Sequence, residues 1–530
     1  MKNTKSDFDL IIIGAGINGA GIARDAAMRG LKVLLIDKGD IGGGTSAWST
    51  RLIHGGLRYL EHGELGLVRE SLRERETLIN IAPHLVEPLP ILIPIYKNAR
   101  RGRQRIRLGM FVYDLLSIGK SLPRHRMLSR QEVIEKIPAL ETEGLEGAAV
   151  YYDAQVEFAE RLVLENVISA SEHGAQVLTY TKVTELITHD DRVTGVTFKD
   201  QFTNEAQTAE AKFIVNAAGP WIDQVIGKDG GSSRLIAGTK GSHIVVPAFP
   251  GSPEEAIYVE AANDRRPFFI IPWNRKYLIG TTDIRYDGDP DQVSITAEEI
   301  DYLLGETNRV LPAANIGRKD ILFTYSGVRP LPFTVGLREA AITRRHFIRQ
   351  HPRLENLVSI VGGKLTTYRR LSEETVDLIG RKLSFPLQAC RTANEHLPGC
   401  SFDNPNEWVR EIERLRLGHR TSARLMRLYG ARATRIEALI KDNPILAERF
   451  DRETRAIAAE VVYAFKNEFA RTLADCLLRR TMVGLNSRCG LNAVESAAYV
   501  GRQHLGWSDE RVEREIIEYR KEVSRCLQKL

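Results

Sequence analysis

Short apolar runs alternate with helical patterns over most of the chain, and this alternation predicts a mixed α/β fold. Leu10–Ile13 is a continuous apolar run, as a strand buried on both faces requires. A helical pattern follows it and ends at Gly30, and Val33–Ile36 forms the next apolar run. Strand, helix and strand in this order are typical of a Rossmann-like dinucleotide-binding unit.

Glycines occupy the turn between the first run and the helix. Gly14, Gly16 and Gly19 have the GxGxxG spacing, in which the first permits a tight turn, the second a close approach to a pyrophosphate, and the third close packing of helix on strand. Phosphate oxygens are favoured at the helix N-terminus. Asp37 ends the second run and can accept hydrogen bonds from ribose hydroxyls. The stretch predicts a dinucleotide and leaves NAD and FAD open.

Three later features favour FAD. A second glycine-rich loop, Lys38–Ser46, suits a cofactor longer than NAD. The apolar run ending at Ala217 leads into small residues, as a strand that ends against a dinucleotide requires. Gly362–Lys364 stands at a second strand, glycine turn and helix, which lacks GxGxxG and so predicts a second contact to the same cofactor. The expected cofactor-binding residues are Gly14, Gly16, Gly19, Asp37, Lys38, Thr45, Ser46, Ala218, Gly219, Trp221, Gly363, Leu365 and Thr366.

Two groups of strands are predicted in the middle of the chain. The first is an antiparallel meander that turns at Asp190 and Asp191, with strands Gln176–Ile187, Arg192–Phe198 and Ala211–Ala217. The second is a mixed sheet around a substrate chamber, with strands Gly241–Pro247, Phe268–Trp273 and Lys276–Thr281.

The pattern changes to amphipathic helices beyond Pro386, for example Val409–Leu417, Ala456–Phe465 and Val512–Leu527. Leu473–Thr481 predicts a buried helix with a polar end and no evident chemistry. All five cysteines of the chain lie in this region, and with no CxxC they indicate neither a disulfide framework nor a zinc site. A reducing compartment fits best.

The predicted fold class is therefore α/β, α+β overall: a Rossmann-like FAD-binding domain interleaved with a mixed β-sheet substrate domain, plus an all-α C-terminal domain. The expected boundaries are 1–385 for the FAD-binding and substrate-binding module and 386–530 for the helical domain, with the substrate part mainly at about 85–150 and 235–320.

A net charge of +6 leaves anionic substrates, lipid headgroups and nucleic acid open as partners. A basic cluster is more specific: Lys97, Arg100, Arg101, Arg103, Arg105 and Arg107 include no acid among them, and LGMFVYDLL follows. This arrangement suits docking on an anionic membrane surface, and equally a solvated loop beside a core helix. No apolar run approaches the roughly 18 residues of a membrane span, and the N-terminus lacks a signal-peptide layout, so we expect a cytoplasmic or peripheral protein.

Several motifs resemble those of the FAD-dependent glycerol-3-phosphate dehydrogenases, in the D-amino-acid-oxidase-like group of flavoproteins. In chain order they are GAGINGAGIARDAAMRG, STRLIHGGLRYLEHGE, NAAGPW, GSHIVVP, IPW with IGTTD, YSGVRPL, AITR and GGKLTTYR. The resemblance runs from residue 10 to about 375, and the helical tail is similar to that family's C-terminal domain. It implies oxidation of sn-glycerol 3-phosphate to dihydroxyacetone phosphate, with electrons passing from the flavin to membrane quinone, at the inner face of the cell membrane.

The resemblance also implies roles for individual residues. It gives Arg58, Arg344 and Lys364 as phosphate ligands and Arg329 as the group at the substrate hydroxyl and its developing oxyanion; all four stand in glycine-rich or strand-end contexts. Tyr59 either hydrogen-bonds the phosphate or packs. His54 and His243 are the candidate proton acceptors, because histidine titrates near neutral pH, and His54 could equally contact the flavin.

The sequence departs from the family pattern at two positions. Arg51 stands where relatives often carry lysine, and Ala218 stands where many carry threonine. Three other functions stay open at this point: a glycerol-3-phosphate oxidase that uses O2, an FAD-dependent amine or amino-acid oxidoreductase, and a flavin-free nucleic-acid-binding protein. Several fixed cations favour a doubly charged phosphate over an amine or amino acid as substrate. We expect no nucleic-acid partner, and a homodimer stays open.

Overall fold

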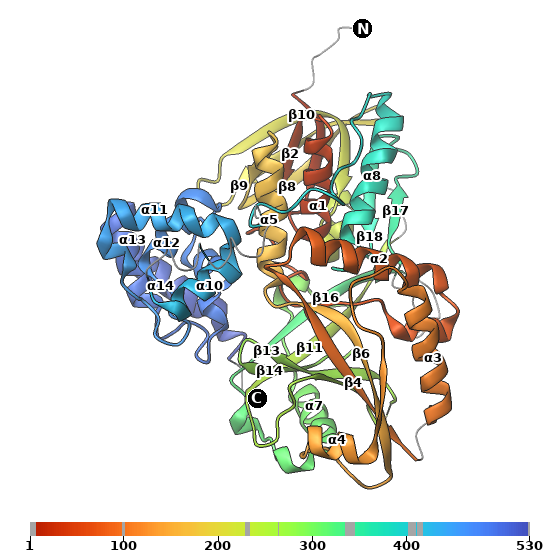
Figure 1. Ribbon diagram of the computed structural model, residues 1–530. Coiled ribbons are helices and arrows are strands. Elements are labelled where there is room, and N and C mark those ends of the chain that lie inside the picture. Colours follow the sequence, from red (N-terminus) through yellow and green to blue (C-terminus); the bar gives the residue numbers. More distant parts are fainter. Residues whose placement is uncertain are drawn as a thin grey trace.

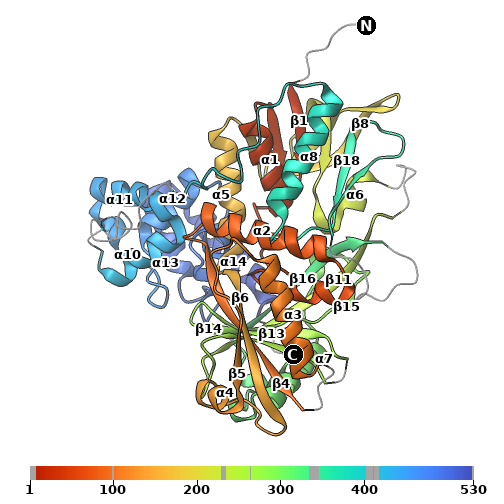
Figure 2. The ribbon, with the colours of Figure 1, turned by 45° about the vertical axis from the view of Figure 1, so that its right-hand side comes forward.

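A computed structural model describes residues 7–97, 101–227, 234–262, 264–333, 345–400, 410 and 417–527. Two sheets with their helices lie one above the other in Figure 1, and a helical domain lies beside them. The view in Figure 2 shows the same three parts, with α3 brought toward the viewer.

The upper sheet carries the glycine-rich turn. Its strands run in the order β17-β18-β10-β1-β2-β7, with β8 and β9 attached through β10. Their bounds are β1 Phe8–Ile13, β2 Val33–Ile36, β7 Gln176–Leu178, β8 Thr181–His189, β9 Arg192–Asp200, β10 Ala206–Asn216, β17 Phe347–Gln350 and β18 Leu357–Val361. The central strands β18, β10, β1, β2 and β7 are parallel. Helices α1 (Ile17–Met28), α5 (Ala159–Glu172) and α8 (Tyr368–Leu383) lie beside this sheet.

The predicted meander is correct only in part. Asp190 and Asp191 do form the turn of an antiparallel pair, β8 with β9. Gln176–Ile187 is not one strand, because Tyr180 has a φ of 53° and separates β7, which joins β2, from β8. The strand predicted at 211–217 pairs in parallel with β1, while the preceding residues of β10 pair with β9.

The lower sheet has its strands in the order β15-β11-β14-β13-β12-β4-β6-β3, with β16 beside β11 and β5 beside β6. Their bounds are β3 Leu52–Ile53, β4 Val86–Tyr96, β5 Arg126–Ser129, β6 Leu145–Val156, β11 Ile236–Pro247, β12 Ala256–Glu260, β13 Pro267–Trp273, β14 Lys276–Gly280, β15 Ile284–Arg285 and β16 Phe323–Pro332. The predicted hairpin at 268–281 is confirmed by β13 and β14. The accompanying helices are α2 Leu65–Ile81, α3 Arg103–Leu116, α4 Arg130–Lys136 and α7 Ala297–Val310. The short helix α6 Ile222–Ile226 instead contacts β8 and β18 of the upper sheet.

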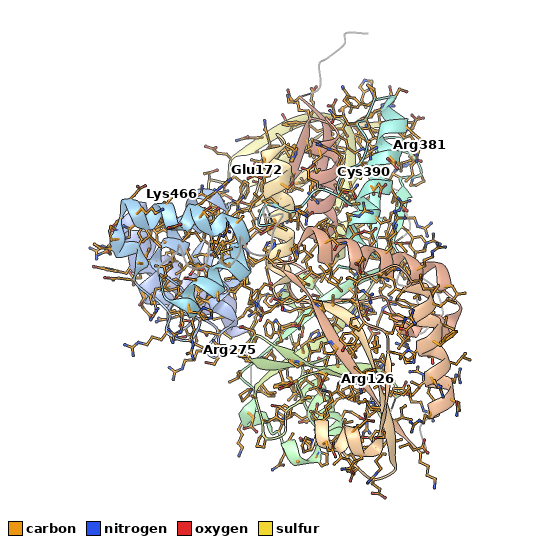
Figure 3. The ribbon with its side chains drawn as sticks, viewed as in Figure 1. Arg126, Glu172, Arg275, Arg381, Cys390 and Lys466 are labelled. Carbon is orange, nitrogen blue, oxygen red and sulfur yellow. The ribbon has the colours of Figure 1, made fainter. Side chains whose placement is uncertain are left out.

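The described C-terminal part is mainly helical. It contains α10 His419–Tyr429, α11 Ala433–Asp442, α12 Ala458–Asn467, α13 Val494–Leu505 and α14 Asp509–Ser524. The helices predicted at 456–465 and 512–527 correspond to α12 and α14, whereas Val409–Leu417 lies almost entirely outside the described residues. Glu172, at the end of α5, faces this domain (Figure 3), and Arg432 donates to its carboxylate at 3.2 Å.

The predicted fold class is thus confirmed: a Rossmann-like sheet interleaved with a mixed sheet, plus a helical C-terminal domain. Segments that alternate along the chain return to the same sheet, so that residues far apart in sequence meet between the two sheets. Ile12, Ile22, Val167, Val215 and Ile379 are fully buried between the upper sheet and its helices, and this core fixes the turn after β1.

Candidate active site

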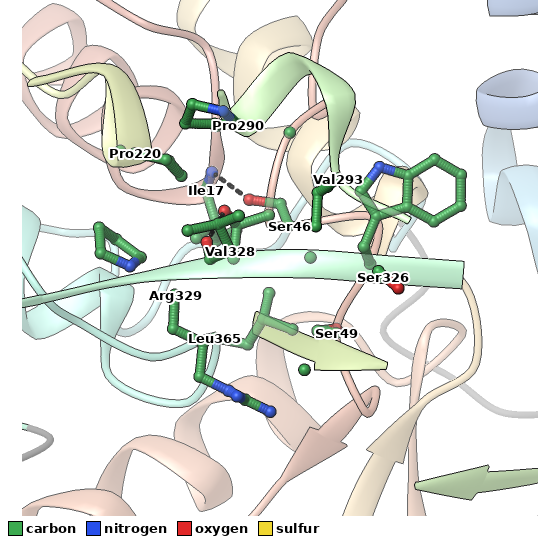
Figure 4. Close-up of a pocket in the computed structure, with 18 of the residues that line it drawn as sticks. Ile17, Ser46, Ser49, Pro220, Pro290, Val293, Ser326, Val328, Arg329 and Leu365 are labelled. Carbon is green, nitrogen blue, oxygen red and sulfur yellow. Dashed lines mark hydrogen bonds between the residues drawn. The ribbon is translucent and has the colours of Figure 1, made fainter. Parts of the chain in front are cut away.

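A cavity of about 920 Å³ lies where the two sheets and the helical domain meet. The residues predicted from the sequence as site residues all line it, with two exceptions. Gly19 lies behind the wall, and Arg344 is outside the described residues. Figure 4 shows Ile17 and Ser46 on one side of this space and Arg329 and Leu365 on another.

The glycines hold the end of β1 against the start of α1. Gly14 has a φ of +106°, and a Cβ there would lie 2.7 Å from the carbonyl oxygen of Ala217. A Cβ on Gly19 would lie 1.8 Å from the carbonyl oxygen of Gly14, which no adjustment of a side chain could relieve. Gly19 therefore acts through packing, since only glycine lets the helix start this close to the strand.

The side chains of Asp37 and Ser46 stabilise the turn between β1 and α1. The backbone N–H of Ala15 donates to Asp37 Oδ2 at 2.5 Å, and that of Ile17 donates to Ser46 Oγ at 3.0 Å, the dashed contact in Figure 4. Asp37 Oδ1 also accepts from the N–H of Gly39 at 2.8 Å. Burial raises the pKa of Asp37, and these two backbone donors oppose that shift.

Lys38 and Trp221 form one rim of the cavity. The Lys38 Nζ lies 4.1 Å from the centre of the Trp221 ring and 2.7 Å from Asp291 Oδ2. The indole Nε1 of Trp221 and the amide Oδ1 of Asn18 are buried and have no hydrogen-bond partner among the described residues. Unpaired buried polar atoms are costly in a protein, so their position on the cavity wall indicates a bound group that pairs with them.

Cations gather at the other end of the cavity. The Lys364 Nζ donates to Ser71 Oγ at 2.9 Å and lies 4.6 Å from the centre of the Tyr59 ring. Arg58 also lines the cavity, and within the described part of the chain it has neither a hydrogen bond nor an ion pair. These two cations and Tyr59 can receive an anionic group.

Arg329 is held in one orientation on β16. Its Nη2 donates to Thr281 Oγ1 at 2.9 Å, and its Nη1 donates to Asp283 Oδ1 at 3.1 Å. Its guanidinium also packs directly against the backbone of Gly241. A Cβ on Gly241 would lie 2.1 Å from Nη2, so a larger residue there would displace the guanidinium. The sequence pattern singled out Arg329 but not Thr281 or Asp283, which orient it.

The two candidate histidines differ in environment. His243 is 1% exposed and its Nε2 lies 3.0 Å from Thr50 Oγ1, while its Nδ1 has no partner among the described residues. Burial, then the charges of Arg329 and Arg51, lower the pKa of His243 well below its ordinary value. Burial also lowers the pKa of His54 to about 4; Asp153 opposes this shift and Lys364 adds to it. Both rings are therefore neutral near pH 7.

Asp153 was missed in the sequence, although it is a charged residue that directly follows the apolar and aromatic positions of β6. Its Oδ1 accepts from Gly55 N at 3.0 Å, Arg75 Nη1 at 2.7 Å and the hydroxyl of Tyr113 at 2.7 Å. Because Gly55 follows His54, this buried carboxylate fixes the loop that presents His54 and Arg58 to the cavity.

Comparison with known proteins identifies the chain. A family model described as "FAD dependent oxidoreductase" matches residues 9–369, and one described as "C-terminal domain of alpha-glycerophosphate oxidase" matches residues 390–512. The chain is 48% identical to the glycerol-3-phosphate dehydrogenase of Synechocystis sp., over 97% of this chain and 95% of that protein. It belongs to the FAD-dependent glycerol-3-phosphate dehydrogenase family.

Other members support this assignment. The aerobic glycerol-3-phosphate dehydrogenase of Staphylococcus aureus is 34% identical over 91% of this chain and 88% of that protein. The crystal structure of the glycerol-3-phosphate dehydrogenase from Bacillus halodurans, complexed with FAD, matches 99% of this chain and 96% of that chain with a TM-score of 0.79 and 29% identity. The L-alpha-glycerophosphate oxidase of Mycoplasma pneumoniae shares the fold (TM-score 0.55, 18% identity, 74% of this chain and 99% of that chain).

FAD is the cofactor of this dehydrogenase family, and the residues present fit it. The N-terminus of α1 is open to the cavity at Gly16, where a pyrophosphate is favoured by the helix dipole. The unpaired atoms of Asn18 and Trp221 lie on the same wall. The same cavity of about 920 Å³ is lined by the glycine turn and by Lys364.

Arg51, the departure from the family pattern, is part of the framework of the protein. Its two terminal nitrogens donate to both oxygens of Glu160 at 2.7 Å, and its side chain is fully buried. It also donates to the carbonyl oxygens of Ala47 and Glu157 at 3.0 and 3.2 Å. A lysine could not make this forked contact, so the arginine fixes the loop between the second glycine-rich loop and β3.

Proposed function

We propose that this enzyme oxidises sn-glycerol 3-phosphate to dihydroxyacetone phosphate and passes the electrons from FAD to a membrane quinone. The cavity that joins a dinucleotide site to a cationic end carries this proposal, because it allows a small phosphorylated alcohol to lie beside the flavin. We also propose the division of the chain at residues 385 and 386, and a place at the inner face of the cell membrane.

The phosphate of the substrate binds at the cationic end. Arg58 and Lys364 supply charge-assisted hydrogen bonds, and Tyr59 lies against Lys364. The family resemblance adds Arg344 as a phosphate ligand, and this residue lies outside the described residues. Lys364 keeps its position through Ser71 when no phosphate is bound. Two or more cations suit a doubly charged phosphate better than the single carboxylate of an amino acid.

The alcohol end then faces Arg329 and His243. Oxidation removes a hydride from carbon and a proton from the hydroxyl, and bound FAD supplies the two-electron acceptor. Arg329, oriented by Thr281 and Asp283, stabilises the developing oxyanion. His243 takes the proton, since its Nδ1 is unpartnered, it is neutral and it lies near Arg329. His54 is the second candidate, and burial together with the nearby charge of Lys364 lowers its pKa.

The test of substrate, cofactor and reaction type is flavin bleaching. Glycerol 3-phosphate added anaerobically to the yellow holoenzyme should abolish the flavin absorbance, and a soluble quinone should restore it. An unchanged spectrum with glycerol 3-phosphate would contradict the proposed substrate. An amine or amino acid that bleaches the flavin instead would point to an amine or amino-acid oxidoreductase.

An oxidase that uses O2 is the second candidate, since the matching C-terminal family model is described by a glycerophosphate oxidase. The two functions differ in what reoxidises the flavin. Hydrogen peroxide formed in air at the same rate with and without quinone would establish the oxidase. Peroxide formation that is slow, with fast turnover only when quinone is added, supports the dehydrogenase.

We propose that α3 docks on the anionic membrane surface. Its outer side exposes a stripe of large apolar side chains, Leu108, Phe111 and Leu115 at 65, 62 and 55%, and Ile118 just beyond it at 69%. Arg105 and Arg107 on the same helix are exposed. In Figure 1 the helix lies at the outer edge of the molecule, away from the helical domain. Within the described residues, no helix is long and apolar enough to cross a membrane.

Vesicle binding tests this surface. Phe111→Asp with Leu115→Asp should prevent sedimentation with anionic vesicles, and Arg105→Gln with Arg107→Gln should make binding weaker and more sensitive to salt. Arg101 is a poor choice for this test, because it pairs with Glu61 and Glu260. Ile517→Asp on α14, where the side chain is 54% exposed, is the control and should bind normally. Normal binding of the α3 variants would place docking elsewhere.

A further inference from the structure

Four buried charges connect the helical domain to the cofactor site. Asp40 belongs to the second glycine-rich loop, while Asp475, Arg479 and Arg480 belong to one turn of π-helix, Asp475–Arg480, in the C-terminal part. Arg480 donates to both oxygens of Asp40 at 2.7 Å, and Arg479 donates to Asp40 Oδ2 at 2.5 Å and to Asp475 Oδ1 at 2.9 Å. All four side chains are at most 8% exposed.

The loop that Asp40 begins is also attached to the start of α1. Gly42 N donates to the carbonyl oxygen of Ala15 at 3.0 Å, and Ser46 Oγ accepts from Ile17 N at 3.0 Å. Asp40 is thus bound to the helical domain, while Gly42 and Ser46 of the same loop contact the turn that receives the pyrophosphate. Since Arg479, Ala474 and Leu478 themselves line the cavity, the helical domain forms part of its wall.

A second contact holds the start of the same loop. The hydroxyl of Tyr180 donates to Asp475 Oδ1 at 2.6 Å, and the backbone N–H of Tyr180 donates to the carbonyl oxygen of Gly39 at 2.9 Å. The π-helical turn therefore reaches the loop twice, through Asp40 and through Tyr180. Burial favours a neutral Asp40, yet the two guanidinium groups hold the pKa of Asp40 below its ordinary value, whereas burial and the charge of Asp40 raise the pKa of Asp475.

A second buried ion pair crosses the same boundary. Arg161 on α5 makes a two-pronged ion pair with Glu468 of the helical domain, at 2.7 and 2.9 Å. This pair joins the domain to a helix and not to the cofactor loop. The backbone carbonyl oxygen of Glu468 also accepts from Arg480 Nε at 2.7 Å, a contact that a substitution of the Glu468 side chain leaves in place.

We propose that Arg479 and Arg480 are positioning residues for FAD: through Asp40, the helical domain keeps the loop Asp40–Ser46 in the conformation that binds the pyrophosphate. The proposal depends on FAD as the cofactor and not on the identity of the substrate or the electron acceptor. It assigns the helical domain a role in cofactor retention.

The experiment compares FAD binding in matched variants. Asp40→Asn and Arg479→Gln remove one partner of the cluster, and Glu468→Gln removes one partner of the control pair. FAD release from the holoenzyme is followed by the rise of flavin fluorescence after dilution, and the dissociation constant by titrating the apoprotein. Neither measurement needs substrate, so failure of the proposed reaction would not affect them.

Asp40→Asn and Arg479→Gln should raise the FAD dissociation constant at least about tenfold, as loss of a charge-assisted hydrogen bond implies. Glu468→Gln should lower the thermal midpoint of the apoprotein by about as much as Asp40→Asn and Arg479→Gln lower it. It should change the FAD dissociation constant less than about twofold. Arg479→Lys and Arg480→Lys keep the charge and should raise the FAD dissociation constant between about twofold and tenfold. They take the place of the neutral variants if those do not fold. Equal weakening of FAD binding in cluster and control variants, or none in the cluster variants, would overturn the proposal.

Discussion

Lys364→Met is the substitution that tests the substrate end of the cavity most directly. Methionine keeps most of the length and apolar stem of the side chain, so packing against Tyr59 is retained while the charge is lost. The Lys364 Nζ is already placed by Ser71 Oγ at 2.9 Å and by the Tyr59 ring at 4.6 Å. The effect should therefore report the interaction with the substrate more than a rearrangement of the protein.

The expected magnitude follows from the type of contact. A hydrogen bond between an ammonium group and a phosphate contributes about 1.5–3 kcal/mol, which corresponds to a loss of about 10- to 150-fold in kcat/KM. A unit charge pair at about 4 Å and an effective dielectric constant of about 20 gives about 4 kcal/mol, which is an upper bound. The loss should appear mainly in KM, because the phosphate is bound equally in the ground state and the transition state.

The assay is steady-state turnover with a soluble quinone at saturating FAD, with glycerol 3-phosphate and with glycerol as substrates. Glycerol lacks the phosphate, so Lys364→Met should leave its slow oxidation unchanged within about twofold. Lys38→Met is the matched control. Lys38 also lines the cavity, but it lies over Trp221 and pairs with Asp291, so KM for glycerol 3-phosphate should not change.

The reasoning is refuted if Lys364→Met leaves KM for glycerol 3-phosphate within twofold of its original value. It is also refuted if the variant loses the same factor with glycerol, because Lys364 would then act on a part of the substrate that both alcohols share. In either case the phosphate would have to bind away from the Tyr59 and Lys364 pair.

Three further predictions concern the alcohol end and its support. Arg329→Ala should lower kcat at least about tenfold with little change in KM, and a purely KM effect would contradict its place at the oxyanion. Burial lowers the pKa of His54 to about 4, so between about pH 6.5 and 4 the unfolded chain binds a proton at His54 that the folded chain does not, and stability falls as the pH falls. His54→Asn should therefore reduce the slope of the unfolding free energy against pH, by at most about 1.4 kcal/mol per pH unit. Urea titrations at several pH values measure this slope. Tyr113→Phe should cost about 1.5–3 kcal/mol in the same titrations, because Asp153 loses a buried donor, and no measurable cost would mean that the contact is dispensable.

Local constraints made the cofactor end predictable. The spacing of Gly14, Gly16 and Gly19 and the position of Asp37 depend on a short strand, turn and helix, whose geometry is fixed within about 30 residues. The β13–β14 hairpin was predictable for the same reason, since its alternating strands flank a two-residue turn. Each of these features is determined by neighbours in the chain.

The supporting contacts were not predictable, because they join distant segments. Ser71 and Lys364 are 293 positions apart, and Asp40 and Arg480 are 440 apart. Neither pairing leaves a periodic signal in the sequence. Leu473–Thr481 predicts only a buried helix with a polar end, and its contact with the glycine-rich loop became visible only when the fold placed Arg479 and Arg480 against Asp40.

Helix α3 links the proposed membrane face to the active site. Its outer side exposes Leu108, Phe111 and Leu115, while Tyr113 on its inner side donates to Asp153 Oδ1. That same oxygen accepts from Gly55 N, in the loop that presents His54 and Arg58. One carboxylate oxygen therefore accepts from both α3 and the loop that carries His54 and Arg58, and we predict that a displacement of α3 on docking shifts this loop. Comparison of kcat/KM in vesicle-bound and free enzyme, with and without Tyr113→Phe, separates this coupling from the effect of quinone supply.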